Sequence, residues 1–259
     1  MHFFETIMLG IIQGLTEFLP ISSSGHLVLM QKLFGLKEGN LTFDTMLHLG
    51  TLLAVLIIFW TDIISMIKKP LSRLTILVVA GTIPTAIIGL SFKDFFERLF
   101  ASGSTLGVEF IITGLILWWA ESRPFGYKQL EEVTLADAGI IGVMQGIAIL
   151  PAISRSGLTI AGALFRGIER DTAARFSFLL SIPSILGAVV LQAKDIRAQG
   201  LGDFQLLPML VGTIISAIFG YLAIKWMLKL ITKGKLKYFA YYVWVLGTVI
   251  IVAQLLGRF

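Results

Sequence analysis

The chain has 259 residues, of which 56% are hydrophobic and 14% are charged, and it has no cysteine. Soluble domains carry about 25% charged residues, so this composition excludes an ordinary soluble fold and indicates an integral membrane protein in a lipid bilayer. The absence of cysteine excludes disulfides and thiolate metal sites. The net charge of +5 does not indicate a nucleic-acid partner, because the lysines lie mostly between apolar runs, where they act as topology signals.

The apolar run at the N-terminus does not have the pattern of a cleavable signal peptide. It lacks a preceding basic segment, and Glu5, Gln13 and Glu17 interrupt it where a small-residue cleavage site is needed. The run belongs to Phe4–Phe34, an apolar segment broken in the middle by polar and turn residues. We expect this segment to enter the membrane and to return to the same face.

The rest of the chain contains six unbroken apolar stretches and one more broken segment. A transmembrane helix needs roughly 20 mostly apolar residues, and each of the six comes close to this length or exceeds it. In chain order they are Phe43–Thr61, Leu74–Phe92, Thr105–Ala120, the broken segment Ala136–Phe165, Thr172–Gln192, Leu206–Ile231 and Tyr238–Leu256. The sequence thus predicts an all-α integral membrane protein, a single domain over residues 1–259, with six transmembrane helices and two re-entrant broken helix pairs.

The two broken segments resemble each other in sequence. "GIIQGLTEFLPISSSG" (10–25) aligns without gaps on "GVMQGIAILPAISRSG" (142–157), with seven of sixteen positions identical and an offset of 132 residues, from Gly10 to Gly142. Such a match at half the chain length indicates an internal duplication, with repeat one over 1–130 and repeat two over 131–259. Three spans separate the broken segments, and three is odd, so the second segment must enter from the opposite face. The prediction is therefore a pair of inverted-topology repeats.

Basic clusters orient this arrangement in the membrane. Lys68, Lys69 and Arg73 follow the first span, and five lysines lie between Lys225 and Lys237. The predicted topology places both clusters on one face, which the positive-inside rule makes cytoplasmic. Both termini are then extracytoplasmic.

Each break carries a charged side chain, Glu17 in the first and Arg155 in the second. A charge at the bilayer centre costs at least ~2.5 kcal/mol on insertion scales, so the two either form a structural salt bridge or share an anion-binding chamber. Each serine-glycine turn precedes a half-helix whose first N–H groups favour phosphate, and Arg155 adds planar, bidentate donors. The phosphate-binding residues predicted on this basis are Ser22, Ser24, Gly25, Ser154, Arg155, Ser156 and Gly157.

Other residues of the first break suggest metal binding and nucleophilic chemistry. Gln13 and Glu17 share a helix face at i, i+4 spacing, and their amide and carboxylate oxygens suit Mg²⁺ or Ca²⁺. Ser23 offers a hydroxyl nucleophile. His26 lies close enough in sequence to act as base or nucleophile, and its structural alternative is a hydrogen-bonded histidine in the protein interior.

The sequence leaves two alternative roles open for each of three polar residues elsewhere. Asp44 and His48 are a second i, i+4 pair, at the head of the first plain span, where they either cap the helix or line the cavity as a second shell around the site. Glu109 is either an interfacial residue or a partner of the site.

"QGLTEFLPISSSGH" (13–26) and "PAISRSG" (151–157) resemble the two signature motifs of the bacterial undecaprenyl-pyrophosphate phosphatase family, also called the bacitracin-resistance protein family. "TFDTMLHLGTLLAV" (42–55) and "FSFLLSIPSILGA" (176–188) are also similar to stretches of that family, so the resemblance covers essentially the whole chain. Two positions depart from the family pattern. Gln13 stands where many relatives have Glu, and Ala152 stands where the second motif usually has Gly.

The resemblance implies a metal-dependent enzyme of the bacterial cell membrane that removes one phosphate from undecaprenyl pyrophosphate at the outer face. It implies recycling of the carrier lipid for peptidoglycan and cell-wall synthesis, and bacitracin resistance. It also implies roles for Glu17 as metal ligand or acid/base, for Ser23 or His26 as nucleophile, and for Arg155 as phosphate clamp. The sequence does not choose between Ser23, His26 and water as nucleophile, and it leaves open whether the protein forms a homodimer. The family's functional residues fall on Gln13, Glu17, Ser22, Ser23, His26, Ser154, Arg155 and Ser156.

Two other functions compete with this interpretation. Inverted repeats with broken helices are typical of transporters, so a flippase for a lipid phosphate is the main alternative. A lipid phosphatase of the phosphatidate-phosphatase type needs a further histidine after its Ser-Arg motif. This chain has His2, His26 and His48 only, and none follows Arg155, which excludes that chemistry.

Overall fold

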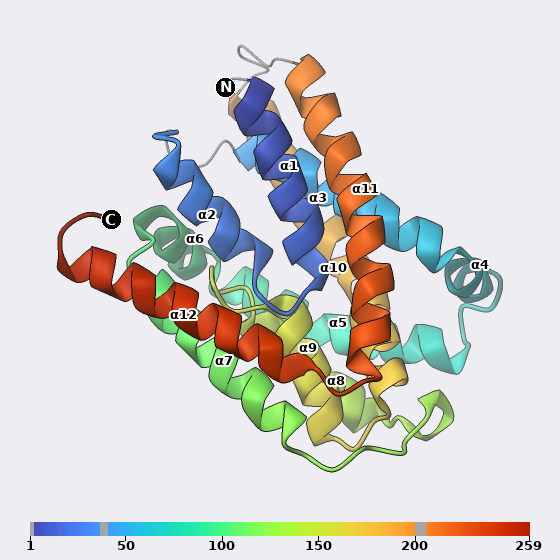
Figure 1. Ribbon diagram of the computed structural model, residues 1–259. Coiled ribbons are helices and arrows are strands. Elements are labelled where there is room, and N and C mark those ends of the chain that lie inside the picture. Colours follow the sequence, from blue (N-terminus) through green and yellow to red (C-terminus); the bar gives the residue numbers. More distant parts are fainter. Residues whose placement is uncertain (1–2, 37–40, 200–205) are drawn as a thin grey trace.

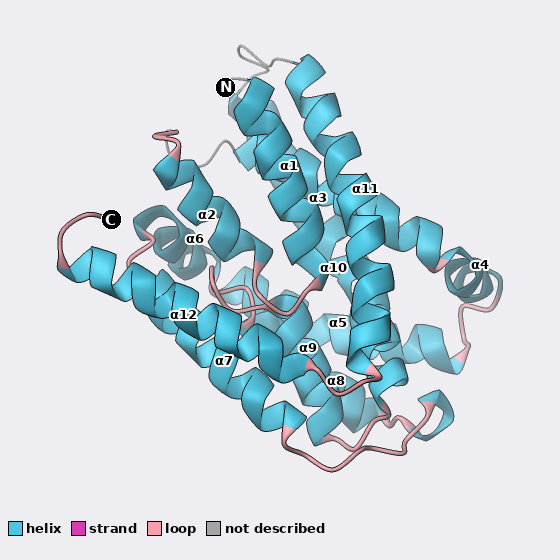
Figure 2. Ribbon diagram, viewed as in Figure 1, coloured by secondary structure: helices cyan, strands magenta, loops and turns pink. Residues whose placement is uncertain are grey.

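The computed structural model describes residues 3–36, 41–199 and 206–259, and every named element within them is helical (Figures 1 and 2). The predicted all-α class is confirmed. The elements are α1 (Phe3–Phe18), α2 (Ser23–Leu33), α3 (Leu41–Ile58), α4 (Trp60–Lys68), α5 (Arg73–Ser91), α6 (Lys93–Ser102), α7 (Leu106–Glu121), the 3₁₀ turn η1 (Leu130–Glu132), α8 (Leu135–Ile147), α9 (Arg155–Phe165), α10 (Arg170–Gln199), α11 (Leu206–Ile231) and α12 (Leu236–Leu255).

Four of the described helices, α5, α10, α11 and α12, are long and apolar enough to cross a membrane. The number rises to six if the bent pairs α3–α4 and α6–α7 each count as one span, with bends of 80° and 110°. These lengths and compositions are those of a multi-pass membrane protein. The six predicted spans correspond to α3, α5, α7, α10, α11 and α12.

Two helices were not predicted, because a hydropathy window measures apolar content and not the direction of the chain. The first span was expected to reach Thr61, but the chain bends after Ile58, and Thr61 belongs to α4. The connection after the second predicted span, residues 93–104, contains the second of these helices, α6. Both helices carry charges beside apolar residues, the pattern of helices that lie along an interface.

The two predicted breaks lie at Leu19–Ser22 and Ala148–Ser154, between α1 and α2 and between α8 and α9. They meet in the centre of the molecule (Figure 1). The Ser22 hydroxyl donates to the Pro151 carbonyl over 2.8 Å, and the Ser156 hydroxyl donates to the Leu19 carbonyl over 3.1 Å. Each break therefore satisfies a backbone carbonyl of the other, which irregular backbone needs inside a membrane protein.

Glycines allow the broken segments to pack closely on neighbouring helices. A Cβ atom on Gly14 of α1 would lie 2.7 Å from the Ser216 carbonyl oxygen of α11. A Cβ atom on Gly142 of α8 would collide with the Gly81 carbonyl oxygen of α5. Small residues at such crossings are what permits close helix packing in membranes.

Two groups of polar contacts mark opposite ends of the helices. At one end, Lys32 after the break donates to the Ser102 carbonyl over 3.2 Å and lies 4.6 Å above the ring of the C-terminal Phe259. At the other end, Glu121 accepts from Arg170 and from the Leu236 amide, at 2.9 Å each. The start of α1 and the C-terminal Phe259 thus lie away from the α7–α8 and α11–α12 connections, as Figure 1 shows.

Candidate functional site

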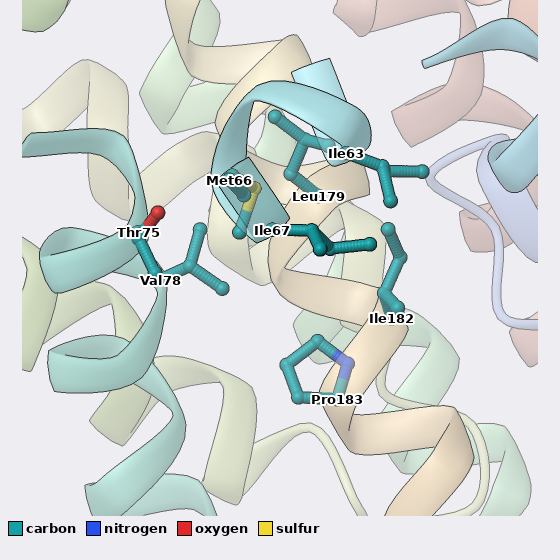
Figure 3. A pocket seen from close by; sticks show the side chains of 8 residues that line it. All are labelled: Ile63, Met66, Ile67, Thr75, Val78, Leu179, Ile182 and Pro183. Atoms are coloured by element: carbon teal, nitrogen blue, oxygen red, sulfur yellow. The ribbon is translucent and has the colours of Figure 1, made fainter. Parts of the chain in front are cut away.

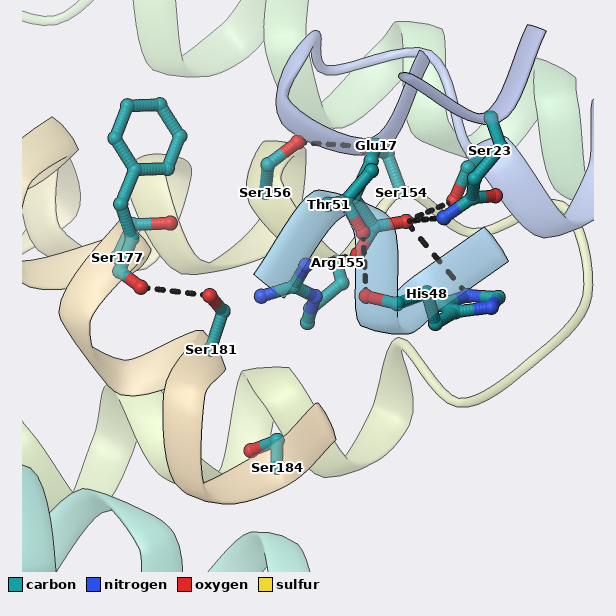
Figure 4. Close-up of polar contacts among 12 residues, drawn as sticks. Glu17, Ser23, His48, Thr51, Ser154, Arg155, Ser156, Ser177, Ser181 and Ser184 are labelled. Atoms are coloured by element: carbon teal, nitrogen blue, oxygen red, sulfur yellow. Dashed lines mark hydrogen bonds and ion pairs between the residues drawn. The ribbon is translucent and has the colours of Figure 1, made fainter. Parts of the chain in front are cut away.

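Glu17, in the last turn of α1, is the centre of a buried polar cluster (Figure 4). Its side chain is only 5% exposed. One oxygen, Oε1, accepts a hydrogen bond from Arg155, and the other, Oε2, accepts from Ser23 over 2.5 Å and from Gln13 over 3.0 Å. The structure therefore brings together four of the residues that the two sequence motifs contribute.

Ser23 and Arg155 occupy equivalent positions in the two breaks. Each is the first residue of the half-helix that follows its break, α2 for Ser23 and α9 for Arg155. The serine before each of them caps its helix, since Ser22 Oγ accepts from the Gly25 amide over 3.3 Å and Ser154 Oγ accepts from the Gly157 amide over 3.1 Å. The predicted placement of both serine-glycine turns at helix N-termini is confirmed. The first residues of two helices, whose N-termini carry partial positive charge, therefore contact one carboxylate.

Helix α7 holds the second break in place. The Glu109 carboxylate accepts from the Ala152 amide over 2.6 Å, while the Thr113 hydroxyl donates to the Ala152 carbonyl over 3.0 Å. Thr113 also accepts from the Ser154 amide over 3.2 Å. Glu109 is thus a buried partner of the second break, one of the two roles that the sequence left open. Thr113 was missed, because a single threonine in an apolar span has no distinguishing pattern.

The predicted phosphate-binding residues differ in how free their side chains are. Ser156 is 1% exposed, and its hydroxyl contacts both the Leu19 carbonyl and Ser154 Oγ, so it joins the two breaks. Ser24 is partly exposed. A Cβ atom on Gly25 would lie 3.0 Å from the Ala152 Cβ, so glycine permits the close contact between the breaks.

His26 lies beside the cluster, with both ring nitrogens occupied. Nδ1 is 2.6 Å from the Ser22 carbonyl oxygen, and Nε2 is 2.8 Å from the hydroxyl of Tyr242 on α12. The ring stacks on Tyr242 and meets the edge of Phe110. Tyr242 was not identified from the sequence, because it is 216 residues from His26 and belongs to no motif.

His48, for which the sequence left open a role as helix cap or as cavity-lining residue together with Asp44, lies next to Glu17. Its Nε2 is 3.8 Å from Glu17 Oε2, and its Nδ1 donates to the Asp44 carbonyl over 2.8 Å. The Asp44 carboxylate accepts from Gln31 over 2.8 Å. Asp44 thus orients His48 through its backbone carbonyl. The His48 side chain is 29% exposed and lies beside Glu17 (Figure 4).

The donor set around Glu17 fits a divalent cation only with ligands from a substrate. The side-chain oxygen of Gln13 is buried and has no hydrogen-bond partner, so it is available to a cation. Within the described residues, no group of three or more His, Asp or Glu side chains could hold a metal by itself. Mg²⁺ is commonly bound by one or two carboxylates plus substrate phosphates and water, and Gln13 with Glu17 matches that mode.

A separate cavity of about 240 Å³ lies between α4, α5 and α10 (Figure 3). Its lining is apolar except for the Thr75 hydroxyl, and it contains none of the residues of the Glu17 cluster. A pyrophosphate needs charged or hydrogen-bonding partners, so this cavity is not the chemical site.

Comparisons with known proteins agree with the arrangement of motifs. The family model described as bacitracin resistance protein BacA matches residues 6–249. A protein of Carboxydothermus hydrogenoformans named undecaprenyl-diphosphatase is 60% identical over 261 residues, which cover 100% of both chains. A protein of the same name from Halothermothrix orenii is 51% identical over 254 residues, 97% of this chain and 98% of the relative. The chain belongs to the bacitracin resistance protein BacA family.

Proposed function

We propose that this protein is an undecaprenyl-diphosphatase, which hydrolyses undecaprenyl diphosphate to undecaprenyl phosphate and inorganic phosphate. The relatives at 50–60% identity over essentially the whole chain carry that name. One observation carries the proposal at the level of chemistry. The Ser23 hydroxyl, the Glu17 carboxylate and the Arg155 guanidinium converge where two helix N-termini meet. The product returns to carrier-lipid recycling for cell-wall synthesis, and removal of the diphosphate, bacitracin's target, gives resistance.

Ser23 is the proposed nucleophile, because its hydroxyl already donates to Glu17. Ser23 Oγ attacks the terminal phosphorus, its proton passes to Glu17, and the bond to the bridging oxygen breaks, releasing undecaprenyl phosphate. A water molecule then attacks the phosphoserine, the bond from phosphorus to Ser23 Oγ breaks, Glu17 returns the proton to Ser23 Oγ, and inorganic phosphate leaves. Arg155 and the N–H groups of α2 and α9 stabilise the charge that develops on the phosphoryl oxygens.

Gln13 Oε1 and Glu17 are the residues that would hold a divalent cation, Mg²⁺ by the donor set described above. When bound, such an ion would neutralise charge on the phosphoryl oxygens. Among the described residues Glu17 Oε1 accepts a hydrogen bond from Arg155 alone, so a lone pair remains for the ion.

The chain is also proposed to consist of two repeats of opposite orientation, residues 1–130 and 131–259. The equivalent glycine pairs support this: Gly10 and Gly14 pack α1 on α11, and Gly142 and Gly146 pack α8 on α5. In the proposed repeats α5 and α11 are themselves equivalent, since each is the second plain span of its half. The two capping serines and the mutual contacts of the breaks add to this support.

The membrane orientation follows from the basic clusters. Arg73 donates to the Val133 carbonyl, and the Leu236 amide donates to Glu121, so both clusters belong to the end opposite the termini. The positive-inside rule makes that end cytoplasmic in the bacterial plasma membrane, and the first break then opens to the outside. A reporter fused after Phe259 should be active only outside the cytoplasm, and cytoplasmic activity would contradict the orientation.

The test of function is phosphate release by the purified protein from undecaprenyl diphosphate in detergent. Transport is undefined in a micelle, so turnover there supports the phosphatase, whereas its absence in a folded protein that still binds the lipid favours a flippase. Undecaprenyl monophosphate is the matched control substrate, and it should release no phosphate.

A further inference from the structure

We infer that His26 and Tyr242 form a brace that holds the strained backbone of Ser22 and thereby positions the Ser23 hydroxyl on Glu17. In this role His26 is a positioning residue and not the nucleophile. The inference rests on the proposed phosphatase function, since it assigns a role within that site.

The backbone of Ser22 is the feature that needs a brace. Its φ is +65°, and it is the only non-glycine residue with positive φ among the described residues. Side chains disfavour this conformation, which persists only when the surroundings impose it. Ser22 is followed directly by Ser23, so the orientation of the Ser22–Ser23 peptide sets where the Ser23 hydroxyl lies.

His26 holds the carbonyl of that peptide. A carbonyl oxygen only accepts, so the 2.6 Å contact means that His26 Nδ1 carries the proton and donates to Ser22. The backbone amide of His26 donates to the same oxygen over 3.3 Å. Nε2 is then the unprotonated nitrogen, and it accepts from the Tyr242 hydroxyl over 2.8 Å. The imidazole is 8% exposed and stacked on Tyr242 with an interplanar angle of 8°.

This arrangement leaves His26 no free lone pair. Attack on phosphorus, or removal of a proton from Ser23, would require the bond from Tyr242 to be broken first. The Ser23 proton, in contrast, already has an acceptor in Glu17.

The second break serves as an internal comparison. Ser154, equivalent to Ser22, has φ −71° and ψ 118°, which is ordinary extended backbone. The position equivalent to His26 is Leu158, whose backbone amide donates to the Ser154 carbonyl over 2.8 Å. At Ser154, where the backbone is unstrained, the equivalent position has no imidazole, and the backbone amide of Leu158 alone holds the carbonyl.

Three variants separate a brace from a nucleophile, with kcat and KM measured on undecaprenyl diphosphate beside a thermal melt in the same detergent. His26→Asn keeps an N–H donor in the place of Nδ1 but cannot form a phosphoenzyme. We expect His26→Ala to lose roughly 100-fold in kcat, the cost of about 1 Å of misplacement, and His26→Asn to recover to within about tenfold of the parent.

Tyr242→Phe removes the hydroxyl that donates to His26 Nε2 and keeps the ring that stacks on the imidazole. We expect kcat to fall about three- to tenfold, for the loss of one hydrogen bond, with KM within about twofold. Tyr241→Phe is the matched control on the same helix, because Tyr241 packs on Trp244 and not on His26, and it should equal the parent.

Two results would overturn the brace. One is a folded His26→Asn protein as inactive as His26→Ala, since loss of a true nucleophile costs ~10⁶-fold whatever replaces it. The other is a Tyr242→Phe protein that matches the parent in kcat. If His26→Ala does not fold, the turnover of His26→Asn and of Tyr242→Phe relative to the parent still tests the brace. A parent protein that releases no phosphate would count against the proposed function and not against the brace.

Discussion

Arg155, the first residue of α9, donates a hydrogen bond to Oε1 of Glu17, in the last turn of α1 (Figure 4). The two residues are 138 positions apart, and each is a charged residue directly beside one of the two breaks. A simple structural salt bridge would explain this contact. It would not explain why Ser23 and Gln13 donate to the same carboxylate. It would also not explain why α2 and α9 both begin beside that carboxylate.

The Arg155→Lys variant distinguishes a salt bridge from a phosphate clamp. Lysine keeps the charge opposite Glu17 but loses the planar fork that binds two phosphate oxygens at once. Losing a positioned donor to the transition state typically costs about 2.7–4 kcal/mol. We expect this variant to fold and to turn over at least ~100-fold more slowly at saturating substrate. A stable variant within a few-fold of the parent would leave Arg155 as a structural partner only.

The Glu17→Gln variant tests the carboxylate as proton acceptor and as metal ligand. An uncharged amide cannot take the Ser23 proton, so turnover should fall by at least ~100-fold, which is the usual contribution of general acid–base catalysis to the rate. Chelation of divalent cations should also stop the parent, and added Mg²⁺ should restore it. Glu97→Gln, on the exposed face of α6, is the control. Full activity in chelator would rule out the cation.

The Ser23→Ala variant tests the nucleophile. It removes the hydroxyl 2.5 Å from Glu17, and we expect turnover to become undetectable, because losing a covalent nucleophile costs ~10⁶-fold. Ser122→Ala, at the exposed end of α7, should be indistinguishable from the parent. A Ser23→Ala protein with substantial turnover would favour water as the attacking group.

Gly142→Ala tests the close crossing of α8 and α5. The added Cβ would collide with the Gly81 carbonyl, so we expect a loss of about 1–3 kcal/mol, or about 2–4 °C in Tm for each kcal/mol. Gly139→Ala lies in the same helix with nothing within 4 Å of its added Cβ. It should melt at the parent's temperature or slightly above, since alanine is the better helix former. Equal Tm values for both variants would contradict the crossing.

Hydropathy and charge along the chain were sufficient to predict the membrane class, the two breaks and a shared location for Glu17 and Arg155. These follow from rules that act locally. A bilayer needs long apolar helices, irregular backbone inside it must be satisfied by protein, and a buried charge needs a partner. With one charge in each of two matching breaks, contact between Glu17 and Arg155 was the simplest expectation, and the structure has that contact.

The contacts of the histidines were decided only by the tertiary structure. Sequence proximity to the serines left His26 open as base or nucleophile beside Ser23, yet its helix turns it toward Tyr242, while His48 on α3 lies 3.8 Å from Glu17. Spacing along a helix determines which residues share a face, but the partner of that face depends on how distant helices pack. The same reason applies to Thr113, which is identified as a partner of the second break only once α7 lies against it.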